Sequence, residues 1–142
     1  MLRIIAHLDM DAFFAAIEER DTPAFRGVPL VVGADPLDGK GRGGAATSNY
    51  LARACGIHSA TPISTAWRLS EAARRAGKPP VTFVSVDMQK YARVSEKVIR
   101  IVRQFIPLVE QASIDEVYGD MSHGEPGGYE MAGSGMDEGF SP

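Results

Sequence analysis

Two short groups of acidic residues interrupt otherwise apolar parts of this sequence. Asp9-Met10-Asp11 follows the apolar run 3–8, and Asp115-Glu116 lies more than 100 residues further along, inside a second apolar segment. If the two segments pair as neighbouring strands of one sheet, three carboxylates converge. Such a cluster is stable when it binds a hard divalent cation, and Mg²⁺ prefers oxygen ligands of this kind. With that pairing, the acids would form a site for a divalent cation such as Mg²⁺.

Each acidic group also has an ordinary structural interpretation. Asp9 and Asp11 stand just before an expected helix, where Asp is a common N-cap residue. Asp115 and Glu116 fall at an expected hairpin turn, where acidic residues are also common. Considered separately, neither group distinguishes a metal site from these structural roles.

Other chemical interpretations find less support in the residues. Asp9-x-Asp11 also resembles the aspartyl-phosphate loop of haloacid-dehalogenase-like phosphatases, but Phe13 occupies a position where Thr or Val is expected. The histidines have no metal-ligand spacing, so we interpret each of them as structural. They are His7, His58 and His123.

The composition is that of one compact domain. The chain has 142 residues, of which 44% are apolar and 23% are charged. Its formal charge of −3 lacks the positive balance of an autonomous nucleic-acid binder. The single cysteine, Cys55, excludes an intramolecular disulfide and suits a reducing compartment. No apolar run approaches the roughly 20 residues that span a bilayer, so we expect a cytoplasmic protein without a membrane partner.

Charge and composition divide the chain into two parts. All 15 Lys and Arg lie within residues 1–120, whereas residues 121–142 contain four acids and no base. This last segment has six Gly, three Ser and two Pro but no Leu, Ile or Val, and cannot bury enough apolar surface to offset its ordering entropy. We therefore expect a domain over 1–120 and a disordered Gly/Ser-rich tail over 121–142.

The local patterns of the first part predict an α+β fold. Strands are expected at 3–8, 28–33, 45–48, 81–84, 108–112 and 116–120. Helices are expected from 13 to the Thr22-Pro23 stop, over 49–54, from Pro62 to near Gly77, and from Asp87 to Pro107. Along the last helix we expect one apolar stripe toward the core, formed by Tyr91, Val94, Val98, Ile101, Val102 and Phe105.

Four longer motifs occur in order over the first 120 residues. They are DMDAFFAAIEE at 9–19, RGVPLVVG at 26–33, ATSNYLAR at 46–53 and SIDEVY at 113–118. Together they closely resemble the amino-terminal part of Y-family DNA polymerases of the DinB (DNA polymerase IV) type. The resemblance implies a palm that supplies the acidic residues, with a small fingers subdomain inserted at about 11–78.

The resemblance also implies a reaction and its metal ligands. Asp9, Asp115 and Glu116 match the catalytic metal-binding carboxylates, and the backbone carbonyl of Met10 matches a further ligand, for two Mg²⁺ ions. In two-metal catalysis one ion activates the primer 3′-hydroxyl and the other neutralises the triphosphate and its leaving group. The implied function is template-directed nucleotidyl transfer to a DNA primer 3′ end during lesion bypass.

Four further residues match positions that contact the incoming deoxynucleoside triphosphate. Thr47, Tyr50 and Arg53 match the positions that hold the triphosphate, and a planar Arg fork can bond two phosphate oxygens at once. Phe14 matches the position whose ring leaves no room for a ribose 2′-hydroxyl. The structural alternatives are ordinary packing for Thr47, Tyr50 and Phe14, and a solvated helix face for Arg53.

The sequence departs from the family pattern after Tyr118. Gly119 replaces a typical Leu, and the further palm helix and strand, the thumb and the basic little finger that usually follow are not visible. We therefore expect an incomplete ferredoxin-like palm, in which the strand at 3–8 has an unpaired edge. Contacts with primer-template DNA and with a sliding clamp would depend on the missing regions.

Two hypotheses about function remain open. The chain is the catalytic palm and fingers portion of a translesion polymerase, active when other domains complete it. Alternatively, it is a non-catalytic remnant that binds nucleotide weakly or serves only as an interaction module. The retained carboxylates favour the first hypothesis, and the absent domains favour the second.

Overall fold

A computed structural model describes residues 2–122 of the chain and confirms the α+β class. The strands are β1 (Ile5–Asp9), β2 (Leu30–Gly33), β3 (Ala45–Ser48), β4 (Thr82–Ser85), β5 (Val109–Gln111) and β6 (Glu116–Asp120). The α-helices are α1 (Phe13–Asp21), α2 (Tyr50–Ala54), α3 (Ile63–Arg75) and α4 (Met88–Phe105). Two short 3₁₀ turns, η1 (Pro23–Phe25) and η2 (Leu37–Gly39), complete the described part.

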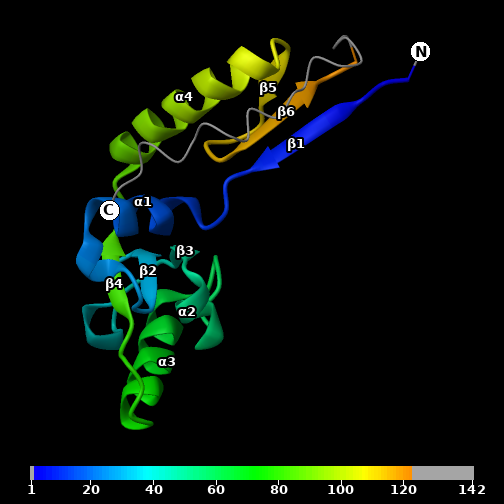
Figure 1. Cartoon of the computed structure of the whole chain (residues 1–142). Coiled ribbons are helices and arrows are strands. Elements are labelled where there is room, and N and C mark those ends of the chain that lie inside the picture. Colours follow the sequence, from blue (N-terminus) through cyan, green and yellow to red (C-terminus); the bar gives the residue numbers. More distant parts are fainter. Residues whose placement is uncertain (1, 123–142) are drawn as a thin grey trace.

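The strands form two separate sheets (Figure 1). In the first sheet, β6 pairs antiparallel with β1 on one side and with β5 on the other, and α4 runs alongside. In the second sheet, β2 lies between β3, which is antiparallel to it, and β4, which is parallel. The order β1, α4, β5, β6 is that of an incomplete ferredoxin-like palm, and the second sheet is inserted between β1 and α4.

Local sequence signals set the ends of the helices. Asn49 is the N-cap of α2, and its side chain accepts a hydrogen bond from the Ala52 N–H. Asp87 caps α4 in the same way, accepting from the Lys90 N–H. Gly56 follows α2 with φ of 87°, the left-handed conformation that glycine adopts most easily at a helix end.

The buried face of α4 differs from the expected stripe. Tyr91, Ser95 and Ile99 form the buried line, whereas Ile101 and Phe105, two of the expected stripe residues, are 53% and 59% exposed. Successive residues turn by about 100° around a helix, so the buried line is rotated to one side of the apolar stripe. Ser95 is accommodated there because its hydroxyl donates to the Ile114 carbonyl. The expectation of one apolar stripe facing the core is therefore wrong for Ile101 and Phe105.

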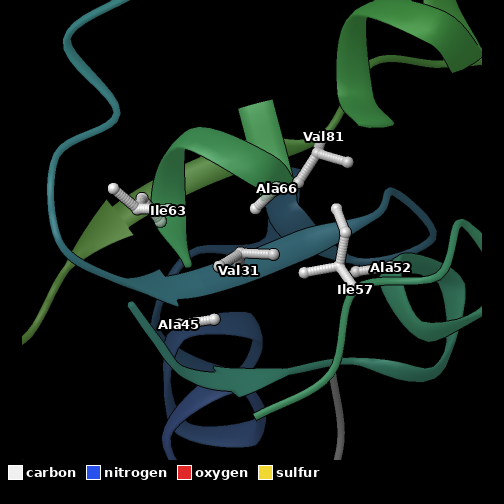
Figure 2. Packing of buried hydrophobic residues seen from close by; sticks show 7 residues of the cluster. All are labelled: Val31, Ala45, Ala52, Ile57, Ile63, Ala66 and Val81. Carbon is white, nitrogen blue, oxygen red and sulfur yellow. The ribbon is translucent and has the colours of Figure 1, made fainter. Parts of the chain in front are cut away.

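Within residues 2–122, strand β2 links two hydrophobic clusters. Successive side chains of a strand point to opposite faces. Val31 packs into a cluster beside α2 and α3, which Figure 2 shows around β2. The other buried members of this cluster are Ala45, Ala52, Ile57, Ile63, Ala66 and Val81. Leu30 and Val32 point the other way, toward a second cluster with Phe13, Ala15, Ile17 and Tyr91. This second cluster joins α1 to α4 and so connects the inserted sheet to the palm.

Strand β1 lies at an edge of its sheet within the described residues, as expected. Ile5 and Leu8 are 48% and 38% exposed. The insertion boundaries at about 11 and 78 stay predictions, and β4, which lies beyond 78, pairs with β2. No helix within residues 2–122 is long and apolar enough to cross a membrane.

The expected disordered tail lies outside the described residues except for its first two positions. Met121 donates its N–H to the Ile4 carbonyl, and Ser122 accepts a hydrogen bond from the Ile4 N–H through its Oγ. These two residues therefore extend the pairing between β6 and the start of the chain. Gly119 has a packing explanation, because a β-carbon there would lie 2.7 Å from Ile106 Cγ2.

Candidate active site

The pairing of β1 with β6 brings the two acidic groups together. Asp9 and Glu116 are register partners at the end of the ladder. One position further along, the Met10 N–H donates to the Asp115 carbonyl at 2.9 Å. Neither Asp9 nor Asp11 is the N-cap of α1, because Ala12 occupies that position. The helix-cap interpretation of the first acidic group is therefore wrong.

Three side chains form a group of potential metal ligands on one face of this sheet. A ligand atom from each of His7, Asp9 and Glu116 lies within 4.8 Å of the other two. His7 and Asp9 are two residues apart on β1, so strand alternation places them on the same face. His7 was missed by the sequence analysis, although this His-x-Asp spacing on a strand was the available signal.

Asp115 lies beside this group rather than within it. Its carboxylate Oδ1 accepts a hydrogen bond from Ser113 Oγ at 2.9 Å. The Ala112 N–H donates to the Glu116 carbonyl at 3.0 Å and closes the tight β5–β6 turn. The expectation of a turn residue thus holds for Asp115. Glu116, in contrast, is the first residue of β6 and pairs with Asp9.

The expected triphosphate-binding residues occupy β3 and α2. Thr47 is half-buried on β3, and Tyr50 and Arg53 lie one turn apart on α2. The Arg53 guanidinium carbon lies 4.7 Å from the centre of the Tyr50 ring, and its Nε donates to the Ser48 carbonyl at 3.1 Å. These contacts hold a cation against the tyrosine ring on α2.

A hydrogen bond connects this helix to the first acidic motif. The Tyr50 hydroxyl donates to the Asp11 carboxylate, and this interaction raises the pKa of the tyrosine above its ordinary value. An open pocket of about 350 Å³ adjoins the pair, with Ala12 and Asn49 in its lining. Asp11, which the sequence analysis left without a role beyond capping, therefore ties the β1–α1 loop to α2.

Phe14 packs against helix α4. Its ring stacks on Tyr91, with centroids 4.3 Å apart and planes 14° apart. The Tyr91 hydroxyl donates to Glu18 Oε1 at 2.6 Å, and the Lys90 Nζ lies 2.8 Å from the same oxygen. Burial and the Glu18 contact raise the pKa of Tyr91, which keeps its phenol protonated. One face of the Phe14 ring is thus fixed by packing.

The comparisons with known proteins agree with this arrangement. Residues 8–127 match the model of the impB/mucB/samB family. The chain belongs to this family. It is 43% identical over 125 residues to DNA polymerase IV of Streptococcus pyogenes serotype M4, and 45% identical over 116 residues to DNA polymerase IV 2 of Methanosarcina mazei. These alignments cover 88% and 82% of the chain but 32% and 29% of the relatives.

Solved structures lead to the same family. DinB from Sulfolobus solfataricus superposes with a TM-score of 0.69 at 30% identity, over 86% of this chain and 32% of that one. An insertion ternary complex of Dbh DNA polymerase gives a TM-score of 0.71, over 85% and 33% of the two chains. The resemblance to Y-family polymerases is therefore confirmed, and the chain spans about a third of the length of these relatives.

Proposed function

We propose that residues 2–122 are the catalytic palm and fingers of a Y-family DNA polymerase, which transfers nucleotides to a primer 3′ end in lesion bypass. The observation that carries the proposal is the β1–β6 register, which sets Asp9 against Glu116 and brings the Asp115 backbone to Met10. Residues far apart in sequence meet at one end of a sheet, in a chain whose relatives are named DNA polymerase IV.

The donor atoms at this sheet end fit Mg²⁺. Asp9 and Glu116 bring carboxylate oxygens close together, and carboxylate oxygens are hard ligands suited to this ion. Asp9, Asp115, Glu116 and the Met10 carbonyl would hold two ions, with Asp115 reorienting from its Ser113 contact. When bound, the ions would activate the primer hydroxyl and neutralise the triphosphate.

The chain's own residues would place the nucleotide. Arg53 and Tyr50 present a guanidinium and a hydroxyl side by side on α2, and Thr47 contributes a further hydroxyl from β3. The ring of Phe14, held against Tyr91, would exclude a ribose 2′-hydroxyl. Primer-template DNA and the deoxynucleoside triphosphate are the proposed substrates, and a sliding clamp would bind through parts of the polymerase outside this chain.

Binding of nucleotide tests this proposal on the chain itself. A deoxynucleoside triphosphate with Mg²⁺ should raise the melting temperature, because a ligand that binds only the folded state stabilises it. Arg53→Ala should weaken nucleotide binding by roughly 10- to 150-fold, since a charge-assisted contact contributes roughly 1.5–3 kcal/mol. Titration calorimetry measures the affinity, and Arg68→Ala, at an exposed position of α3, is the matched control.

Two outcomes would count against the proposal. An unchanged melting temperature at saturating nucleotide would favour the alternative, a non-catalytic module. Equal losses for Arg53→Ala and Arg68→Ala would show that binding depends on general positive charge rather than on the α2 site.

A further inference from the structure

We propose that His7 is a positioning residue that orients the Glu116 carboxylate for divalent-cation binding, an inference that rests on the proposed function. His7 Nε2 lies 3.2 Å from Glu116 Oε1. An ionised carboxylate can only accept hydrogen bonds, so Nε2 carries the hydrogen and donates it. One carboxylate oxygen of Glu116 is held by the imidazole, and the other is free to face an ion.

A second contact fixes the imidazole itself. His7 and Tyr118 are register partners on β1 and β6, and their rings stack with centroids 4.5 Å apart and planes 12° apart. The tyrosine ring therefore sets the plane of the histidine. Because the Nε2 position follows from that plane, the stack and the hydrogen bond act together on Glu116.

The surroundings explain why such support is needed. The side chains of His7 and Glu116 are 43% and 35% exposed, so solvent and free rotation compete for the carboxylate. A long carboxylate side chain loses rotamer freedom when it binds an ion. A neighbouring N–H that already restrains one oxygen reduces that loss and raises affinity, as partners of metal ligands do elsewhere.

Direct coordination by His7 is the competing role. Its Nε2 is already engaged with Glu116, and Mg²⁺ prefers oxygen to imidazole nitrogen. Positioning through the hydrogen bond therefore agrees better with the observed contact than a ligand role does.

Binding of Mn²⁺, a paramagnetic substitute for Mg²⁺, tests the inference on the full chain. His7→Phe keeps an aromatic ring against Tyr118 but removes the N–H, and should weaken Mn²⁺ binding by about tenfold. Electron paramagnetic resonance of free Mn²⁺ gives the affinity, and the melting temperature of the metal-free protein should change little. His7→Gln, which retains a side-chain N–H, should restore part of the affinity. His58→Phe, at an exposed position in the α2–α3 loop, is the matched control and should bind Mn²⁺ as the unmodified chain does.

A second variant keeps the inference testable if His7→Phe does not fold. Tyr118→Leu leaves the histidine in place but removes its stacking partner, and should weaken Mn²⁺ binding less than His7→Phe does. Unchanged Mn²⁺ affinity in both variants would overturn the positioning role. Nitrogen hyperfine coupling from His7 to bound Mn²⁺ would overturn it as well, in favour of coordination. Absence of Mn²⁺ binding by the unmodified chain would overturn the proposed metal site and the inference with it.

Discussion

A buried carboxylate shows how single residues join the fingers to the palm. Glu18 of α1 is only 5% exposed; it accepts a hydrogen bond from the Tyr91 hydroxyl and forms an ion pair with Lys90, both on α4. A buried charge is costly unless partners satisfy it. The same tyrosine supports the Phe14 ring, so this network couples folding stability to the proposed sugar-contacting residue.

Removal of one hydroxyl tests this network. Tyr91→Phe keeps the ring under Phe14 but deprives Glu18 of a donor, and should lower the free energy of unfolding by about 1.5–3 kcal/mol. Urea denaturation measures the change. Tyr118 is 43% exposed, so Tyr118→Phe is the control and should change stability by less than about 0.5 kcal/mol. If both variants lose similarly little free energy of unfolding, the Tyr91–Glu18 hydrogen bond does not contribute the expected stability.

At the scale of single residues, sequence reasoning found the acids but missed His7. The acids are recognisable because they interrupt apolar runs. The contact between His7 and Glu116 joins residues that are 109 apart in sequence, and it depends on the register of β1 against β6. The His-x-Asp spacing could have marked His7 as a neighbour of Asp9, but no local pattern sets that register, so the contact with Glu116 becomes visible only in three dimensions.

Asn49 acts at the scale of elements, because one side chain connects three of them. It accepts from the N–H groups of Ala52 and Leu30, and donates to the Glu19 carboxylate and the Val28 carbonyl. The residue is buried, and its bonds to the N–H groups of Ala52 and Leu30 are buried as well, so their loss leaves polar groups with little access to water. Asn49 therefore fixes α2, with its proposed nucleotide-binding residues, against β2 and α1.

Substitution of Asn49 should lower the free energy of unfolding more than substitution of an N-cap residue that makes only the capping bond. Asn49→Ala should lower the free energy of unfolding by about 3 kcal/mol, the sum of a lost cap and unsatisfied buried groups. Asp87→Ala removes the exposed cap of α4, whose side chain accepts a hydrogen bond from the Lys90 N–H, and should cost about 1 kcal/mol. Denaturant melts of the two variants give the comparison, and equal losses would show that the bonds of Asn49 beyond its cap contribute nothing.

The ends of helices were predictable where the signal is local, whereas the buried face of helix α4 was not. The start of α4 at the Asp87 cap depends on neighbouring residues alone, and the structure has it as expected. Asn49, expected as the first residue of the helix over 49–54, is instead its N-cap, and the Gly56 helix end also depends on local signals alone. The buried face of α4 depends on where the sheet docks, which is a long-range property. Its buried line includes Ser95, which no apolar pattern would select, because a backbone carbonyl at Ile114 satisfies the hydroxyl.

At the scale of the whole molecule, charge limits what the chain can do alone. The first 120 residues are nearly neutral and the chain carries −3, whereas DNA binding draws much of its affinity from neutralised phosphates. Within the described residues, β1 has a partner on one side only. The chain also spans about a third of the length of its relatives. We therefore expect that efficient primer extension requires the remaining parts of such a polymerase.

Phe14 provides a test of this expectation and of the proposed sugar selection together. Joined to the complementary part of a DNA polymerase IV relative, residues 1–120 should extend primers with deoxynucleotides. In that fusion, Phe14→Ala should raise ribonucleotide incorporation by about tenfold or more, because it removes the ring that would meet the 2′-hydroxyl. Phe14→Tyr keeps the ring and should retain the selectivity.

The isolated 142-residue chain should be far slower, since a misplacement of about 1 Å at the reacting atoms can cost roughly 100-fold in rate. Gel-based primer extension measures all four reactions. Efficient extension by the isolated chain would contradict the charge argument, and unchanged sugar selectivity in the Phe14→Ala fusion would leave Phe14 as a packing residue against Tyr91.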